Sequence, residues 1–107
     1  MSVNIIDNSR QVNDEMLKKI QNALWAIGAT AEGYAKDNCP VDTGRLRNSI
    51  THAEKIDEQS TYIGTNVEYA PYVEAGSSKT SAHHMLRDAC QNHTNEYKAI
   101  AEAALKA

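Results

Sequence analysis

A single proline constrains most strongly how this chain can fold, because it ends the longest helical pattern in the sequence. Pro40 lacks the amide proton that a helix interior needs, and it disfavours the helical conformation for Cys39 before it. The long helix that precedes the proline must therefore end at about Asn38.

The residues after the proline predict a sharp turn. Asp42 and Thr43 have short polar side chains that can bond backbone amides, and Gly44 permits a positive φ. Arg45 and Arg47 are two residues apart, so they project to the same side if the chain is extended here. From local chemistry alone, the simplest interpretation is a helix-to-strand corner with solvated arginines.

Apolar side chains at intervals of three and four residues predict the helix that runs from about residue 11 to the proline. Its apolar stripe consists of Leu17, Ile20, Leu24, Ile27, Ala31 and Tyr34. Gly28 and Gly33 interrupt this pattern, and each weakens a helix by up to about 1 kcal/mol relative to alanine. One reason for a glycine at such a position is the close approach of another element or chain.

The chain after the corner predicts a hairpin and a short helix. Residues 49–56 and 60–64 are rich in residues that favour strands, and the polar residues 57–59 form the turn between them. Residues 67–76 predict one or two helical turns, with Pro71 in the first turn and Gly76 as a left-handed stop.

The two ends of the chain complete the expected fold. Val3 and Ile5 alternate with polar residues and predict a short strand at a sheet edge. A second long helix is expected from about Ala82, with its stripe formed by Leu86, Ala89, Cys90, His93, Tyr97, Ile100 and Ala104. The sequence therefore predicts a single α+β domain over residues 1–107. In it, two long helices pack on a small antiparallel sheet, and a short helix follows the second hairpin strand.

Composition excludes several classes of function. A hydrophobic content of 41% and a charged content of 23% are ordinary for a globular protein. The net charge of −3 argues against broad, sequence-independent binding to nucleic acid. No apolar run is long enough to span a membrane, and the N-terminus lacks a signal-peptide pattern. We therefore expect a cytoplasmic site of synthesis, where Cys39 and Cys90 stay reduced.

Histidine and cysteine residues near the C-terminus raise the question of a metal site. The candidates are His83, His84, Cys90 and His93. Zinc sites usually combine two close pairs of ligands, but two adjacent histidines point in different directions on a helix. His93 also lies on the apolar stripe, which favours a packed histidine. The sequence therefore predicts no metal site.

Other catalytic arrangements have equally weak support in the sequence. Cys39 and His52 could form a nucleophile and its base, but no third orienting group is indicated. No glycine-rich phosphate-binding loop is present. We expect no cofactor and no enzymatic activity. Three tyrosines could lie at an interface, because tyrosine combines a large apolar area with a polar tip: Tyr62, Tyr69 and Tyr72. The alternative is that two of the three lie in the core, since the chain has no phenylalanine to fill it.

Two blocks of residues carry a family resemblance. The stretch Pro40-Val41-Asp42-Thr43-Gly44-Arg45-Leu46-Arg47-Asn48-Ser49-Ile50 and the later stretch from Ile63 to Gly76 resemble, in order and spacing, head-tail joining or tail-completion proteins of long-tailed double-stranded DNA phages and prophages. The resemblance extends over roughly residues 12 to 92. The chain departs from the family pattern at Ala75 and at His84-Met85.

The resemblance implies a structural virion protein of the phage neck or tail, made in the cytoplasm of the host bacterium. Such proteins assemble as rings, here expected to be sixfold, and contact other neck or tail proteins without catalysis or cofactor. DNA would pass through the ring without specific binding, and no membrane is involved. The residues expected near protein contacts are Asp42, Thr43, Gly44, Arg45, Arg47, Tyr69, Pro71, Tyr72, Glu74, Ser77, Ser78 and Lys79.

Two other functions remain as alternatives. The first is a small phage-encoded regulator that binds nucleic acid through Arg45, Arg47 and Lys55. The second is a metal-dependent enzyme that uses the histidine and cysteine cluster. The acidic composition argues against the first, and the ligand spacing argues against the second.

Overall fold

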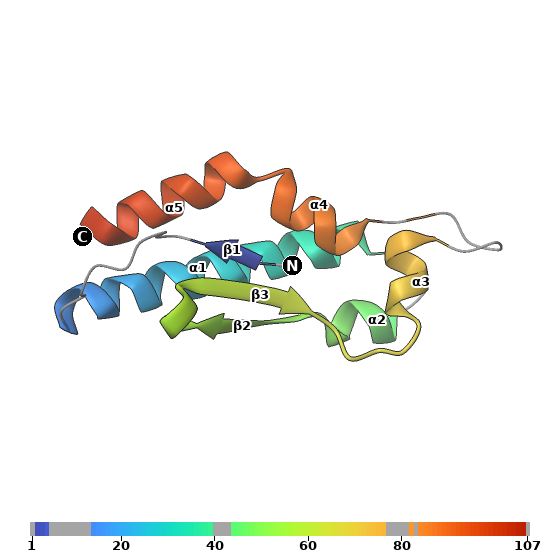
Figure 1. Ribbon diagram of the computed structural model, residues 1–107. Helices are drawn as coiled ribbons and strands as arrows, with labels where there is room; N and C mark the ends of the chain where they lie inside the picture. The colour runs from blue at the N-terminus through green and yellow to red at the C-terminus, as the bar shows by residue number, and fades with distance from the viewer. Residues whose placement is uncertain (1, 5–13, 40–43, 77–81, 83, 107) are drawn as a thin grey trace.

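The computed structural model describes residues 2–4, 14–39, 44–76, 82 and 84–106. The molecule is elongated, with extents of 50 × 21 × 21 Å. One long helix, α1 (Asp14–Asn38), runs along most of this length (Figure 1). It ends at Asn38, as Pro40 predicts. The predicted turn at residues 40–43 and the predicted loop at 77–81 lie outside the described residues.

A three-stranded antiparallel sheet packs against α1, with the strand order β1-β3-β2. The hairpin is formed by β2 (Thr51–Lys55) and β3 (Ser60–Gly64), and the short strand β1 (Ser2–Asn4) pairs with the other side of β3. The sequence therefore predicted the hairpin and the edge strand correctly. The connection between β2 and β3 is a single 3-10 turn, η1 (Ile56–Glu58), and Gln59 after it has a positive φ of 54°.

The interpretation of the stretch around the two arginines as a simple helix-to-strand corner is wrong, because a short helix lies between α1 and β2. Arg45 and Arg47 lie on a short helix, α2 (Gly44–Ser49), and Gly44 begins this helix without a positive φ. Leu46 is the reason that a helix is stable here, because its side chain is completely buried in the core while both arginines are exposed. The helix α2 ends at Ser49, five residues after Gly44, and the chain then enters β2.

The short helix after the hairpin is confirmed as α3 (Ala70–Ala75), with Pro71 in its first turn. Gly76 follows with a φ of 82° and a ψ of 167°, so its φ is positive as predicted but its ψ is extended. A Cβ at this position would meet Ala82 at 3.0–3.3 Å. Glycine is therefore required at position 76 by both conformation and space.

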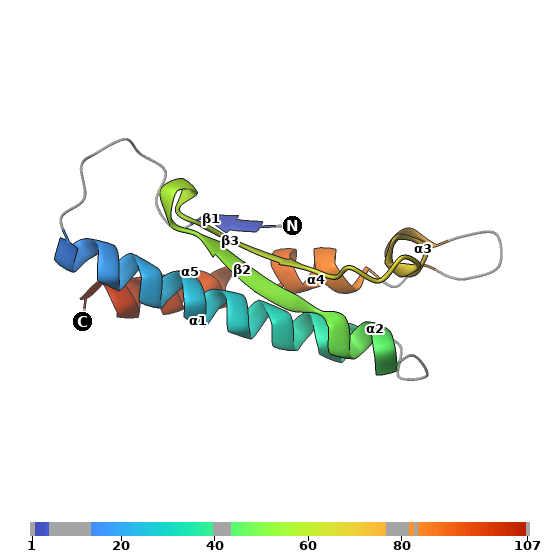
Figure 2. The same ribbon diagram turned by 90° about the horizontal axis from the view of Figure 1, so that it is seen from below.

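The prediction of a second long helix is also wrong. Two shorter helices, α4 (Met85–Gln91) and α5 (Thr94–Lys106), lie along α1 (Figures 1 and 2). The apolar stripe continues across the break, but Asn92 and Thr94 have low helix propensity. The hydroxyl of Tyr97 donates a hydrogen bond to the carbonyl of Ala89. In a continuous helix, a backbone amide of the next turn would bond this carbonyl instead.

The core runs along α1 and extends to the end of the molecule at which α2 and α3 lie. Its members are Ile27, Ala31, Ala35, Cys39, Leu46, Ile50, Ile63, Val67, Ala70, Met85, Ala89, Cys90, Tyr97 and Ala101. Alanines are frequent in this set, and they allow α4 and α5 to approach α1 closely. In the described part of the chain, no helix is both long and apolar enough to cross a membrane.

Candidate functional site

The two sequence blocks come together at one end of the molecule, which we call the tip. The tip consists of α2, residues 64–76 and the first turn of α4. In both views α2 and α3 lie at this end, and the first turn of α1 and the last turn of α5 lie at the opposite end (Figures 1 and 2).

An ion pair joins the two blocks. The Arg45 guanidinium donates from Nη1 to Glu68 Oε1 at 3.2 Å and from Nη2 to Glu68 Oε2 at 2.9 Å. The same guanidinium lies over the Tyr69 ring, 5.6 Å from its centroid. These hydrogen bonds with Arg45 lower the pKa of Glu68, so the carboxylate stays charged to more acidic pH than usual.

A second contact between the blocks involves hydroxyl groups. Ser49 Oγ donates to the Leu46 carbonyl at 2.7 Å and lies in hydrogen-bond contact with Thr65 Oγ1. Thr65 Oγ1 also accepts from the Val67 amide at 3.1 Å. The end of α2 and the segment between β3 and α3 are therefore held by polar contacts in addition to the core residues beneath them.

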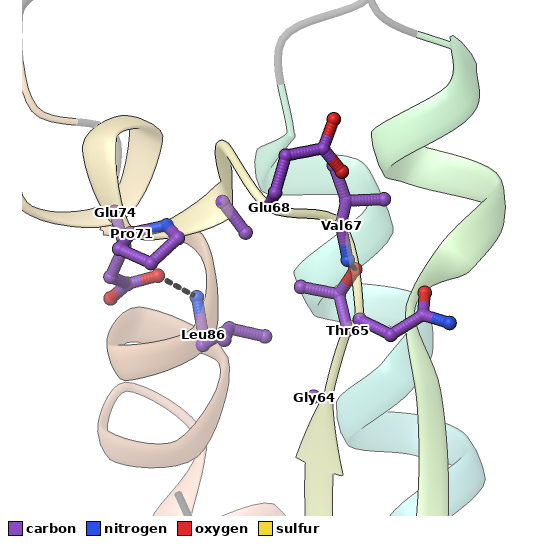
Figure 3. Close-up of a pocket in the computed structure, with 9 residues that line it drawn as sticks. Gly64, Thr65, Val67, Glu68, Pro71, Glu74 and Leu86 are labelled. Carbon is purple, nitrogen blue, oxygen red and sulfur yellow. Dashed lines mark hydrogen bonds between the residues drawn. The ribbon is translucent and has the colours of Figure 1, made fainter.

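Glu74 ties α3 to the start of α4. Its carboxylate accepts from the Leu86 amide at 2.8 Å and from the Arg87 amide at 3.1 Å, and Figure 3 shows the first of these bonds. His84, the residue in the N-cap position, makes no side-chain capping bond. A carboxylate from a different helix therefore satisfies two of the amides that the first turn of α4 leaves without intrahelical partners.

The tip contains a hollow with a volume of about 370 Å³ (Figure 3). Its lining combines apolar side chains with two carboxylates and consists of Gly64, Thr65, Asn66, Val67, Glu68, Ala70, Pro71, Glu74 and Leu86. The hollow is thus built mainly by the second block, and α4 closes one side of it.

The structure brings together most of the residues that were expected at protein contacts. Gly44, Arg45, Arg47, Tyr69, Pro71, Tyr72 and Glu74 all lie at the tip. Arg45 and Glu74 are already engaged within the chain, so Arg45 is paired with a carboxylate rather than simply solvated. Arg47 and Tyr72 are exposed, and Tyr72 is exposed by 63%. Asp42, Thr43, Ser77, Ser78 and Lys79 lie outside the described residues.

The interpretation that two of the three tyrosines form core is wrong. Tyr62 and Tyr72 are exposed by 38% and 63%, and Tyr69 is half-buried beside the core. Tyr97 takes the core position, with only 2% of its surface exposed. Tyr62 donates a hydrogen bond to Glu58 at 2.6 Å, which holds its ring against the hairpin.

The candidate metal ligands are placed in different environments. His93 stacks on Tyr34 with a centroid distance of 3.5 Å, and burial raises the pKa of the Cys90 thiol. His83 lies outside the described residues. Among the residues that are described, no group of three or more histidine, cysteine, aspartate or glutamate side chains is arranged to hold a metal ion.

Sequence reasoning missed a second surface, where α1 crosses β2. Trp25 is 62% exposed, and its ring stands edge-on to His52 at 5.9 Å. Beneath it, His52 Nδ1 and Glu54 Oε1 lie 3.0 Å apart, within ion-pair distance, although neither makes a well-aligned hydrogen bond within the described structure. The available signal was the position of Trp25 next to Leu24 and off the apolar stripe.

Comparison with known families gives a match that spans both blocks. The model of the family described as "Bacteriophage HK97-gp10, putative tail-component" matches residues 4–76. The chain belongs to this family. The match contains both blocks and ends at Gly76, so it does not cover α4 and α5, although the resemblance was expected to reach residue 92.

One curated protein of a different kind is also similar to part of the chain. The crossover junction endonuclease EME1 of Eremothecium gossypii is 34% identical over 71 residues, which are 66% of this chain and 10% of that protein. The chain thus spans about a tenth of the length of this relative. No solved structure matches the chain.

Proposed function

We propose that this member of the HK97 gp10-like tail-component family joins the phage head to the tail, as a tail-completion or connector protein of the neck. Its role is structural, and it acts by assembly into a ring, expected to be a hexamer, and by contacts with other neck or tail proteins. The family match over residues 4–76 is the observation that carries this proposal.

The geometry of the tip supports a role in protein contacts. The ion pair between Arg45 and Glu68 and the capping bonds of Glu74 fix the shape of the tip from within the chain. This leaves Arg47 and Tyr72 exposed on a defined framework. Arginine and tyrosine are among the residues that contribute most to protein interfaces. We place contacts with a neighbouring subunit or partner at these two side chains.

The other functions have less support. Arg45 is held by Glu68, which leaves fewer cationic groups for a nucleic-acid surface on a chain of net charge −3. The nuclease activity named for the EME1 relative is not carried over, because the matched stretch is only 10% of that protein. The acidic composition is compatible with a ring through which DNA slides without binding.

Deletion of the gene from the parent phage or prophage tests the proposed function. Electron microscopy of the induced particles should show DNA-filled heads and finished tails that remain separate. Expression of the intact protein from a plasmid should restore joined particles. Joined, infectious virions from the deletion strain would contradict the proposal. A salt-sensitive gel shift of duplex DNA would then favour the regulator.

A further inference from the structure

Trp25 is an apolar side chain that is both exposed and fixed in place. It is the only tryptophan of the chain, and 62% of its surface is accessible. Its ring meets the His52 ring in a T-shaped contact, with the centroids 5.9 Å apart and the ring planes at 78°. Tryptophan is strongly enriched among the residues that dominate binding energy at protein interfaces. The surface around Trp25 therefore fits the role of a protruding group that a partner covers.

The hollow at the tip has apolar walls and room for such a side chain. Its volume of about 370 Å³ is at the small end of the range of protein binding pockets, roughly 300–1,000 Å³, and suits one aromatic side chain. Val67, Ala70, Pro71 and Leu86 provide apolar walls.

The hollow also offers polar groups that an indole can use. The Trp25 indole has one N–H donor and needs an acceptor when it is buried. Glu68 and Glu74 are among the residues that line the hollow, and although each carboxylate already accepts two hydrogen bonds, carboxylate oxygens have further lone pairs.

Charge around the two surfaces is also complementary. Lys18 lies seven residues before Trp25 and thus on the same side of α1, two helical turns away. Its side chain is exposed, and none of the ion pairs among the described residues includes it. Of the two carboxylates at the hollow, Glu68 is paired with Arg45, whereas Glu74 binds only backbone amides and keeps its negative charge. A copy that presents Trp25 therefore also brings a positive charge towards that of Glu74.

The two surfaces cannot meet within one chain. Trp25 precedes Asn38 by 13 residues, which corresponds to about 20 Å along the helix. Asn38 marks the tip end of α1, because its side chain donates to the Met85 carbonyl at 3.4 Å, next to Leu86 of the hollow. A contact between Trp25 and the hollow must therefore join two molecules.

We propose that Trp25 of one copy inserts into the tip hollow of the next copy. The two surfaces differ, so the contact is head-to-tail, and repetition of such a contact closes a ring when the rotation allows it. This inference rests on the proposed ring and specifies the surfaces that build it.

Variants of the isolated protein give the first test. Trp25→Ala should weaken self-association by roughly 30-fold or more, as expected for a central interface residue. Met16→Ala removes another exposed apolar side chain of α1, 42% accessible, and should leave self-association within about twofold. The emission of Trp25, the only tryptophan, should shift to the blue as the unmodified protein assembles. Rings of Trp25→Ala with unchanged affinity would overturn the inference.

A mixture of two variants tests the head-to-tail geometry. Asn66→Phe fills the hollow from an exposed position and leaves Trp25 intact, whereas Trp25→Ala leaves the hollow open. At a protein concentration at which the unmodified protein assembles but the weakened contact does not form, each variant alone should be monomeric. In the equimolar mixture, Trp25 of the Asn66→Phe variant can still enter the open hollow of the Trp25→Ala variant. This single contact for each pair should give dimers but no rings. A mixture that behaves like its separate components would contradict the inference.

Cross-linking in assembled particles decides the question if the isolated protein needs its partners to assemble. The photoreactive residue p-benzoylphenylalanine at position 25 should form adducts with residues 64–74 of another copy, identified by mass spectrometry. Adducts with a different virion protein, or none with residues 64–74, would overturn the inference. If heads and tails are nevertheless joined in those particles, the proposed function stands, and only the proposed contact between Trp25 and the hollow is given up.

Discussion

The tip and the body of this molecule share one apolar core but differ in the polar contacts that connect their elements. In the body, α1 packs on the sheet and on α5 through buried apolar side chains such as Ile27 and Ala31. In the tip, buried side chains such as Leu46 are supplemented by polar contacts, with Arg45 bound to Glu68 and Glu74 bound to the first turn of α4. Apolar burial is therefore common to both regions, and the polar contacts of the tip define its shape.

This difference predicts which residues can be replaced most freely. Many combinations of apolar residues can fill a core of the right volume. A carboxylate that must reach two amides of another helix allows far fewer replacements. We therefore expect the polar residues of the two blocks to tolerate fewer replacements than the apolar residues of α1, although the family match includes both α1 and the two blocks.

The largest effect is expected in the body, at Gly28. A Cβ on Gly28 would lie 2.6 Å from His52 Nδ1 and 2.6 Å from Thr61 Oγ1, so α1 could not keep its distance from the sheet. We expect Gly28→Ala to lower the free energy of unfolding by about 1–2 kcal/mol, because the overpacking exceeds the gain in helix propensity. Urea unfolding monitored by circular dichroism measures this change.

Gly33 offers a matched control on the same helix. No neighbouring heavy atom lies within 4 Å of a Cβ built on Gly33. Gly33→Ala should therefore raise the free energy of unfolding, by up to about 1 kcal/mol. Equal effects of the two substitutions would show that the close fit between α1 and the sheet does not determine the stability of the body.

Local patterns predicted the elements whose limits depend on nearby residues. Pro40 marked the end of α1, the polar turn at 57–59 marked the hairpin, and Pro71 with Gly76 marked α3. Of the two helical glycines, only Gly28 lies at a close approach, to β2 and β3. The sequence alone could not distinguish Gly28 from Gly33, because the difference depends on the path of the sheet across α1.

The errors arose where distant residues decide the local structure. Periodicity continues across Asn92, but the fold ends α4 there and places Tyr97 against the Ala89 carbonyl. The sequence pointed to the two blocks but not to the contact between them, because Arg45 and Glu68 are 23 residues apart along the chain. The packing of Leu46 converts the segment around Arg45 into a helix.

In the tip, Glu74 should have the next largest effect. Glu74→Ala removes the acceptor of the Leu86 and Arg87 amides, and α4 has only seven residues. The loss of a capping side chain typically costs about 1 kcal/mol. Hydrogen exchange should become faster at these two amides. Glu74→Gln, which keeps one acceptor oxygen, should retain part of the protection, and unchanged exchange in Glu74→Ala would contradict the capping role.

The smallest effect should come from the exposed ion pair, and its pH dependence gives it a clear signature. Arg45 lowers the pKa of Glu68 in the folded protein, so the contact stabilises the fold above the pKa that glutamate has in an unfolded chain, about 4.3. This contribution is lost as the pH falls through the lower pKa of the folded state. Glu68→Gln should therefore lower the Tm slightly at pH 7 but not at a pH below the folded-state pKa, and added salt should reduce the difference.

Arg45→Ala should behave in the same way, whereas Arg47→Ala should show no such pH dependence. A Tm difference that is independent of pH would mean that Arg45 acts through its packing on Tyr69 rather than through its charge.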